Sequence, residues 1–98
     1  MIITIVQEGN TLKVTPKGHL DGAGAAELDA ELKELPEGTA NALFDFSKLD
    51  YISSAGLRVL LSAHKAMSAK GGMKVTNVNE VVREVFDVTG FADILTIE

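Results

Sequence analysis

Residues 41–47, Asn-Ala-Leu-Phe-Asp-Phe-Ser, form a nearly continuous apolar run, and this run restricts the fold more than any other feature. A strand that is covered on both faces has this pattern, because neither of its faces needs polar residues. We therefore expect a central strand here, in a sheet that helices cover. Asp45 interrupts the run near its end, where a loop would begin.

Two β-branched and aliphatic runs, at 2–6 and 11–15, come before this strand and are separated by a Gly-Asn pair. Glycine and asparagine tolerate the positive φ of a tight turn, so the two runs predict an antiparallel hairpin. Leu12 and Val14 alternate with polar residues, which predicts one solvated face. Pro16 is expected to end the second strand or confine it to an edge, because proline has no backbone N–H to donate.

Three later segments repeat apolar residues at the spacing of an amphipathic helix. The first follows the glycine-rich residues 18–24 and ends near Pro36, the second runs from residue 57 to the Lys-Gly-Gly at 70–72, and the third lies within 79–90. A strand at 73–78 separates the last two, and the final eight residues predict only a short strand or tail.

The resulting order is β-β-α-β-α-β-α, perhaps with a last short strand. It predicts an α/β fold with a mixed sheet of four to five strands and helices packed on it. With 98 residues, of which 46% are hydrophobic, the chain can bury one core, so we expect a single domain over residues 1–98. Ligand sites in such sheets lie in loops beyond the carboxyl ends of parallel strands, and the loop before the second helix has that position.

Composition excludes several kinds of site and partner. The chain has no cysteine and only two histidines, so we expect no disulfide, no metal site and no cofactor. A net charge of -5 disfavours nucleic acid and anionic membranes, which require clustered Lys or Arg. No segment approaches the roughly 20 apolar residues of a membrane span, and no signal peptide is recognisable. These features predict a cytoplasmic protein that does not insert into membranes and has a protein or small-molecule partner.

Ser53 and Ser54 stand directly before the second helical segment. One hydroxyl can cap the helix by accepting a bond from a free backbone N–H, which contributes about 1 kcal/mol. The other then has no structural task. A helix N-terminus accommodates a phosphate through its free N–H groups and its dipole, so a phosphate here would leave the helix intact and repel a partner at the surface. Arg58, one turn after Ser54, can lean toward such a phosphate or face solvent.

Enzymatic interpretations find little support in the residues. The Ile-Ser-Ser-Ala-Gly sequence is not the Gly-x-Ser-x-Gly turn of α/β-hydrolases, and His64 flanks an apolar stripe, where a packed role is expected. His19 has no distinguishing context. The glycines at 18, 22 and 24 lack the Lys-Ser/Thr of a phosphate loop and are expected to allow a tight bend. We therefore expect no catalytic activity.

Two segments carry a resemblance to a known family: "LFDFSKLDYISSAGLRVLLSAHKAMSAKGG" at 43–72 and "GHLDGAGAAEL" at 18–28. They resemble the STAS family, the sulfate-transporter and anti-sigma-factor-antagonist domain, and the likeness covers most of the chain. It implies the STAS fold. Because the chain is short, the resemblance further implies a bacterial anti-sigma-factor antagonist, a regulator of transcription rather than an enzyme.

The resemblance also implies partners. The unphosphorylated antagonist would bind a serine-kinase anti-sigma factor and so release a sigma factor. The kinase would phosphorylate the antagonist, and a metal-dependent phosphatase of the PP2C type would reverse the reaction. The alternative is a STAS docking module that works without phosphorylation, such as an accessory subunit of a lipid-transport ABC system or part of a sensory complex.

By position, the resemblance makes Ser54 the phosphate acceptor, with the carboxylates of Asp21 and Asp45 beside it. Ser53 stands where many antagonists carry Asp, and it offers a second hydroxyl. Ala55 and Gly56 keep the surface small enough for a partner to approach. The implied docking surface comprises Ser53, Ser54, Ala55, Gly56, Leu57 and Arg58.

Overall fold

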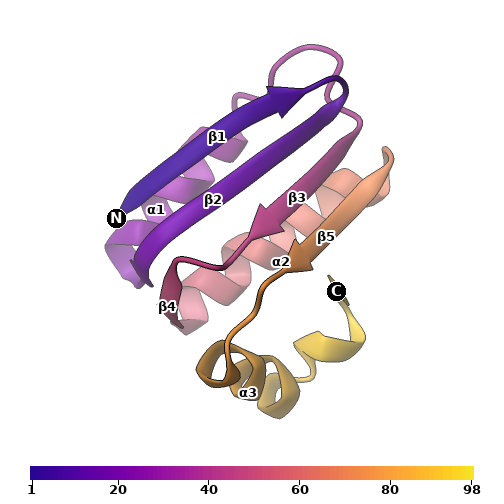
Figure 1. Ribbon diagram of the computed structural model, residues 1–98. Coiled ribbons are helices and arrows are strands. Elements are labelled where there is room, and N and C mark those ends of the chain that lie inside the picture. Colours follow the sequence, from indigo (N-terminus) through magenta and orange to yellow (C-terminus); the bar gives the residue numbers. More distant parts are fainter.

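The computed structural model describes residues 1–98, which fold into six strands and three α-helices around one mixed sheet (Figure 1). In chain order the elements are β1 (Ile2–Glu8), β2 (Thr11–Leu20), α1 (Gly22–Leu32), β3 (Asn41–Asp45), β4 (Leu49–Ile52), α2 (Ser54–Ser68), β5 (Gly72–Thr76), α3 (Glu80–Thr89), the short 3-10 helix η1 (Phe91–Asp93) and β6 (Thr96–Ile97).

The sheet has the strand order β1-β2-β3-β5-β6, and β4 pairs with β2 beyond the end of β3. β1 and β2 form the expected antiparallel hairpin, and every other pairing is parallel. Gly9, at the turn of the hairpin, has a φ of +63°, a conformation that favours glycine. The predicted α/β class is confirmed, and the element order agrees with the prediction except for β4, which was not expected. The sheet has six strands because β4 occupies residues that we expected to form a loop.

β2 continues through Pro16 to Leu20 and lies inside the sheet, next to β1 on one side, so the expectation that Pro16 ends the strand or confines it to an edge is wrong. The strand changes parallel partner along its length. It pairs with β3 as far as Val14 and with β4 from Gly18 onward. Pro16 lies between these two ladders, where the missing N–H is not needed. Gly18, with a φ of +105°, stands at the register shift that redirects the strand toward β4.

α1 and α2 lie side by side and cover one face of the sheet, behind the strands in Figure 1. The core forms between this face and the helices, and α3 packs against β4. The largest fully buried side chains of the core are those of Phe44, Phe46, Phe86, Leu12, Leu20, Leu28, Leu49, Ile52 and Leu60. The packing of helices on one face fixes which side chains of each strand point inward.

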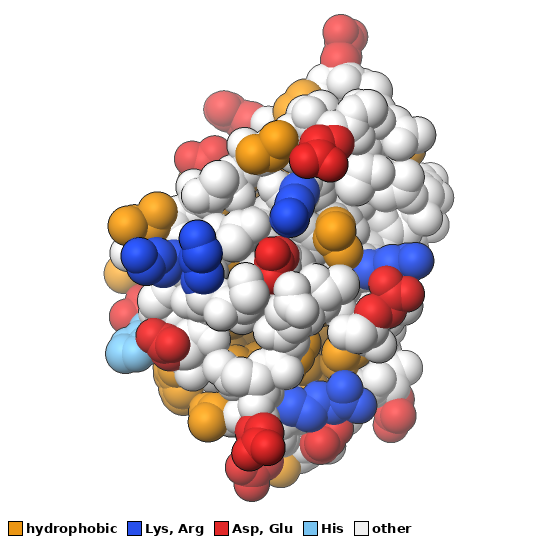
Figure 2. Space-filling model, in the orientation of Figure 1, with side chains coloured by type: hydrophobic (Ala, Val, Ile, Leu, Met, Phe, Trp, Pro, Cys, Tyr) orange, Lys and Arg blue, Asp and Glu red, His pale blue; other side chains and the backbone are white.

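The opposite face of the sheet is open, and Figure 2 shows it with charged and isolated hydrophobic side chains intermixed. β3 buries only Ala42 and Phe44, whereas Leu43 between them is half-buried on the open face. The expectation that this strand is buried on both faces is therefore wrong. No helix in the structure combines the length and apolar character needed to cross a membrane.

Candidate functional site

The N-termini of α1 and α2 lie next to each other at the carboxyl ends of β2 and β4. They do so because β2 and β4 run parallel, with Leu20 paired to Ile52, and each strand is followed by one capping residue and a helix. Asp21 caps α1 and Ser53 caps α2. The free backbone N–H groups of both helix N-termini therefore lie close together, which makes this end of the sheet favourable for negative charge.

The hydroxyl of Ser53 is fully used by the fold. Its Oγ accepts a hydrogen bond from the backbone N–H of Gly56 at 3.3 Å and donates to the carbonyl of Leu20 at 2.8 Å. The backbone N–H of Ser53 donates to the same carbonyl at 2.9 Å. Ser53 therefore caps α2 and ties it to the end of β2, and the side chain is only half exposed.

Ser54 is the first residue of α2, and its side chain is exposed and makes no hydrogen bond within the chain. Arg58 is also exposed and forms no ion pair. The two residues are four positions apart on one helix, so they lie on the same side of it, one turn apart. The spare hydroxyl anticipated from the sequence is thus that of Ser54.

Gly56 and Leu57 are buried, which corrects the expectation that they belong to a docking surface. A Cβ added at Gly56 would lie 2.8 Å from Leu20 Cγ and 2.9 Å from Ile52 Cγ1. The glycine is therefore required by close packing of α2 on β2 and β4, rather than by the approach of a partner. Of the predicted surface, Ser54 and Arg58 are exposed, and Ser53 and Ala55 are half exposed.

Asp21 performs on α1 the task that Ser53 performs on α2. Its Oδ1 accepts a hydrogen bond from the N–H of Gly24, three residues on, at 2.9 Å. Gly24 is buried, and a Cβ there would lie 3.0 Å from the carbonyl oxygen of His19. Gly22 and Gly24 are part of the first turn of α1, so the expected bend at the three glycines is found only at Gly18.

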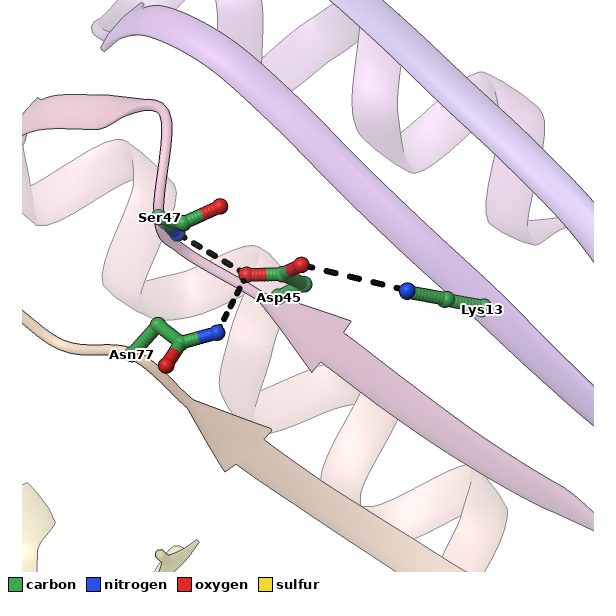
Figure 3. A network of polar contacts seen from close by, with 4 residues as sticks. All are labelled: Lys13, Asp45, Ser47 and Asn77. Carbon is green, nitrogen blue, oxygen red and sulfur yellow. Dashed lines mark hydrogen bonds and ion pairs between the residues drawn. The ribbon is translucent and has the colours of Figure 1, made fainter.

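Asp45 belongs to a different network, at the end of β3 (Figure 3). Its Oδ1 accepts hydrogen bonds from Asn77 Nδ2 at 2.9 Å and from the Ser47 N–H at 3.0 Å, and Lys13 Nζ lies 4.0 Å from Oδ2. The hydrogen bond from Asn77, followed by that from Ser47, lowers the pKa of the Asp45 carboxyl below its ordinary value. None of these contacts involves Ser54. Asn77, which has a φ of +58°, was not among the site residues predicted from the sequence.

The histidines are not arranged as catalytic bases. His19 lies in β2 and packs edge-on against Tyr51, with ring centroids 6.2 Å apart. His64 is half-buried on α2, as its sequence position suggested, and its Nδ1 is buried without a hydrogen-bond partner. Neither ring bonds to a serine, and no three His, Asp or Glu side chains gather closely enough to hold a metal ion.

Comparison with known proteins agrees with this geometry. The sequence model of the STAS domain family matches residues 2–98 of the chain. BtrV of Bordetella bronchiseptica, provisionally named an anti-sigma factor antagonist, is 39% identical over 83 residues, which are 83% of this chain and 72% of BtrV. The anti-sigma-B factor antagonist of Bacillus subtilis is 30% identical over 97% of this chain and 88% of its own length.

The solved structure of the anti-sigma factor antagonist SpoIIAA in its unphosphorylated form has the same fold. It superposes with a TM-score of 0.82 over 99% of this chain and 88% of SpoIIAA, at 17% identity. The chain therefore belongs to the STAS domain family. Within that family it groups with the anti-sigma factor antagonists, which are binding regulators and not enzymes. The resemblance seen in the sequence is confirmed.

Proposed function

We propose that the chain is a phosphorylation switch whose acceptor is Ser54. One observation carries the proposal. Of the two adjacent hydroxyls, that of Ser53 bonds to Gly56 and Leu20, whereas that of Ser54 is exposed and free. A kinase can reach Ser54 without opening the fold, and the N-terminus of α2 stabilises the charge that phosphorylation adds.

The proposed partner is a serine-kinase anti-sigma factor, bound at the surface formed by the N-terminal ends of α1 and α2. Unphosphorylated, the antagonist occupies the anti-sigma factor and frees its sigma factor. A phosphate on Ser54 brings about -1.5 to -2 charge into that contact, which costs desolvation and dissociates the complex. A phosphatase of the PP2C type restores the free hydroxyl. Since bacterial transcription is cytoplasmic, the proposed function places the chain in the cytoplasm.

The carboxylate of Asp21 is proposed to support this site, because it caps the helix beside that of Ser54. Arg58 is proposed to contact the partner, being the exposed cation one turn along α2. Leu57 and Gly56 act indirectly, since their burial against β2 and β4 holds the first turn of α2 in position.

Phosphorylation is tested by incubating the chain with a serine-kinase anti-sigma factor and ATP and measuring intact mass. Wild type should gain one phosphate, and Ser54→Ala should gain none. Ser53→Asp is the matched control, because aspartate removes the second hydroxyl and keeps a capping oxygen, as Asp21 does on α1. It should still be labelled. Loss of label in Ser53→Asp, with retention in Ser54→Ala, would assign the acceptor to Ser53 instead.

Binding is measured separately, by calorimetry with the same anti-sigma factor. Ser54→Ala should bind like wild type, and Ser54→Asp should bind at least about tenfold more weakly. If Ser54→Asp binds as tightly as wild type, charge does not control docking, and a module that docks without phosphorylation describes the chain better.

A further inference from the structure

The two edges of the sheet differ in length. β6 closes one edge with only two residues. β1 closes the other with seven, Ile-Ile-Thr-Ile-Val-Gln-Glu, and pairs with β2 alone. Proteins usually protect a long edge strand with lysine, proline or a bulge, because its outward N–H and C=O groups pair readily with another strand. β1 has none of these features, and its outer edge has no partner within the chain.

The open-face side chains of β1 are also unusually apolar for an edge. Ile2 is 62% exposed and Val6 is 45% exposed, with Thr4 between them. Glu8 is the only charged residue of the strand and stands at its end. β1 thus combines free backbone hydrogen-bonding groups with exposed side chains that would gain from burial against a similar strand.

We propose that β1 pairs antiparallel with β1 of a second copy of this chain, about a two-fold axis through Thr4. The two sheets then form one continuous sheet, and both copies use the same surface. In this register Ile2 of each copy lies opposite Val6 of the other, and Ile3 lies opposite Ile5. Each exposed apolar side chain of β1 therefore gains an apolar neighbour.

The charges of Glu8 and Lys17 favour this register over the next one along the strand, in which the two-fold axis passes through Ile5. If the axis passed through Ile5, Glu8 would lie opposite Ile2 of the second copy. With the axis at Thr4, Glu8 extends past the paired segment on the side of Lys17 of the second copy, because Lys17 is the β2 partner of Ile2. Glu8 and Lys17 form no ion pair within the chain, so their opposite charges are available to each other.

Pairing over residues 2–6 of each copy buries well below the roughly 800 Å² per partner of a standard interface, so the dimer is reversible and forms at high protein concentration. It also leaves the switch accessible. β2 separates β1 from β4, and Ser54 follows β4. The dimer therefore presents two Ser54 sites, and the inference does not depend on the proposed function.

The chain contains no cysteine, so single-cysteine variants report the register directly. Thr4→Cys places two thiols opposite each other on the axis and should form a cross-linked dimer under mild oxidation. Val6→Cys is the matched control, because its thiols lie four residues apart along the paired strands and cannot meet. Equal cross-linking of the two variants would indicate random collision and overturn the proposal.

Sedimentation equilibrium from low micromolar to near-millimolar protein tests the uncrosslinked chain. Wild type should associate, and Thr4→Lys should weaken association at least about tenfold, because two like charges then meet on the axis. Thr96→Lys adds the same charge to the open face at the opposite edge and should associate like wild type. A monomeric wild type at every concentration, or an equal loss in both lysine variants, would refute the dimer.

Discussion

Replacement of Gly56 by alanine tests whether close packing positions the first turn of α2. The new Cβ would lie 2.8 Å from Leu20 Cγ, 2.9 Å from Ile52 Cγ1 and 2.9 Å from the Leu20 carbonyl oxygen. Real Cβ contacts are essentially never closer than 3.0 Å, so something must move. Leu20 and Ile52 are 0% and 1% exposed and have no free space to enter. The helix must therefore shift away from the sheet.

Overpacking of this kind costs about 1–3 kcal/mol, and the better helix propensity of alanine returns up to about 1 kcal/mol. The free energy of unfolding should therefore fall by about 1–2 kcal/mol. Urea denaturation followed by circular dichroism measures it, since the chain has no tryptophan. With a slope of about 1 kcal/mol per molar urea, the midpoint should fall by about 1–2 M.

Gly22→Ala is the matched control. Gly22 is in the first turn of α1, as Gly56 is in that of α2, but a Cβ there meets nothing within 4 Å. This variant should be about 0.4–1 kcal/mol more stable than wild type, because alanine restricts the unfolded chain. The packing argument is refuted if Gly56→Ala unfolds at or above the wild-type midpoint. A loss of equal size in Gly22→Ala would refute it too.

Four further variants test the caps and the Asp45 network. Ser53→Ala should lose about 1–2 kcal/mol of stability, because it removes both the cap and the hydrogen bond to the Leu20 carbonyl, and Ser54→Ala should stay within about 0.5 kcal/mol of wild type, both by urea denaturation. Asn79→Ala should lower the melting temperature, because its side chain both caps α3 and bonds to the β4 carbonyl of Leu49, together worth about 1–2 kcal/mol. The folded-state pKa of Asp45 is lowered, so its contribution is present at neutral pH and is lost as pH falls below about 4. Asp45→Asn should therefore be less stable than wild type at neutral pH, with a difference that shrinks in acid denaturation curves; a constant difference would contradict this.

The sequence predicted those parts of the fold that depend on local periodicity. The hairpin, the three helices and their order follow from alternating or helical spacing, which a single segment carries by itself. β4 was missed because it has only four residues and buries the first and last of them, Leu49 and Ile52, which is not an alternating pattern. β4 exists because it pairs with the second half of β2, a long-range contact that no local sequence pattern encodes. Because β2 changes from β3 to β4 as its parallel partner around Pro16, the missing N–H of this proline is tolerated.

For the site, the sequence predicted that one of two serines caps α2 and left the identity of that serine open. The backbone decides it, because Ser53 is extended, with a ψ of 173°, and Ser54 is already helical. The proximity of Asp21 to this turn also depends on the unpredicted pairing of Leu20 with Ile52. Asp45 was grouped with Ser54 by resemblance alone, and its hydrogen bonds instead join the ends of β3 and β5.

Serine rather than aspartate at position 53 changes the electrostatics of the proposed switch as well as the capping of α2. Asp21 and Ser53 accept the same kind of bond, from the N–H three residues on, but only the hydroxyl can also donate, and it does so to the Leu20 carbonyl. An aspartate at 53 would cap equally and could not make that second bond. It would also place a fixed negative charge next to Ser54. With serine there, a phosphate on Ser54 would meet the helical N–H groups without a second carboxylate in addition to that of Asp21, so the phosphorylated form should be destabilised less by like-charge repulsion than in a Ser53→Asp variant.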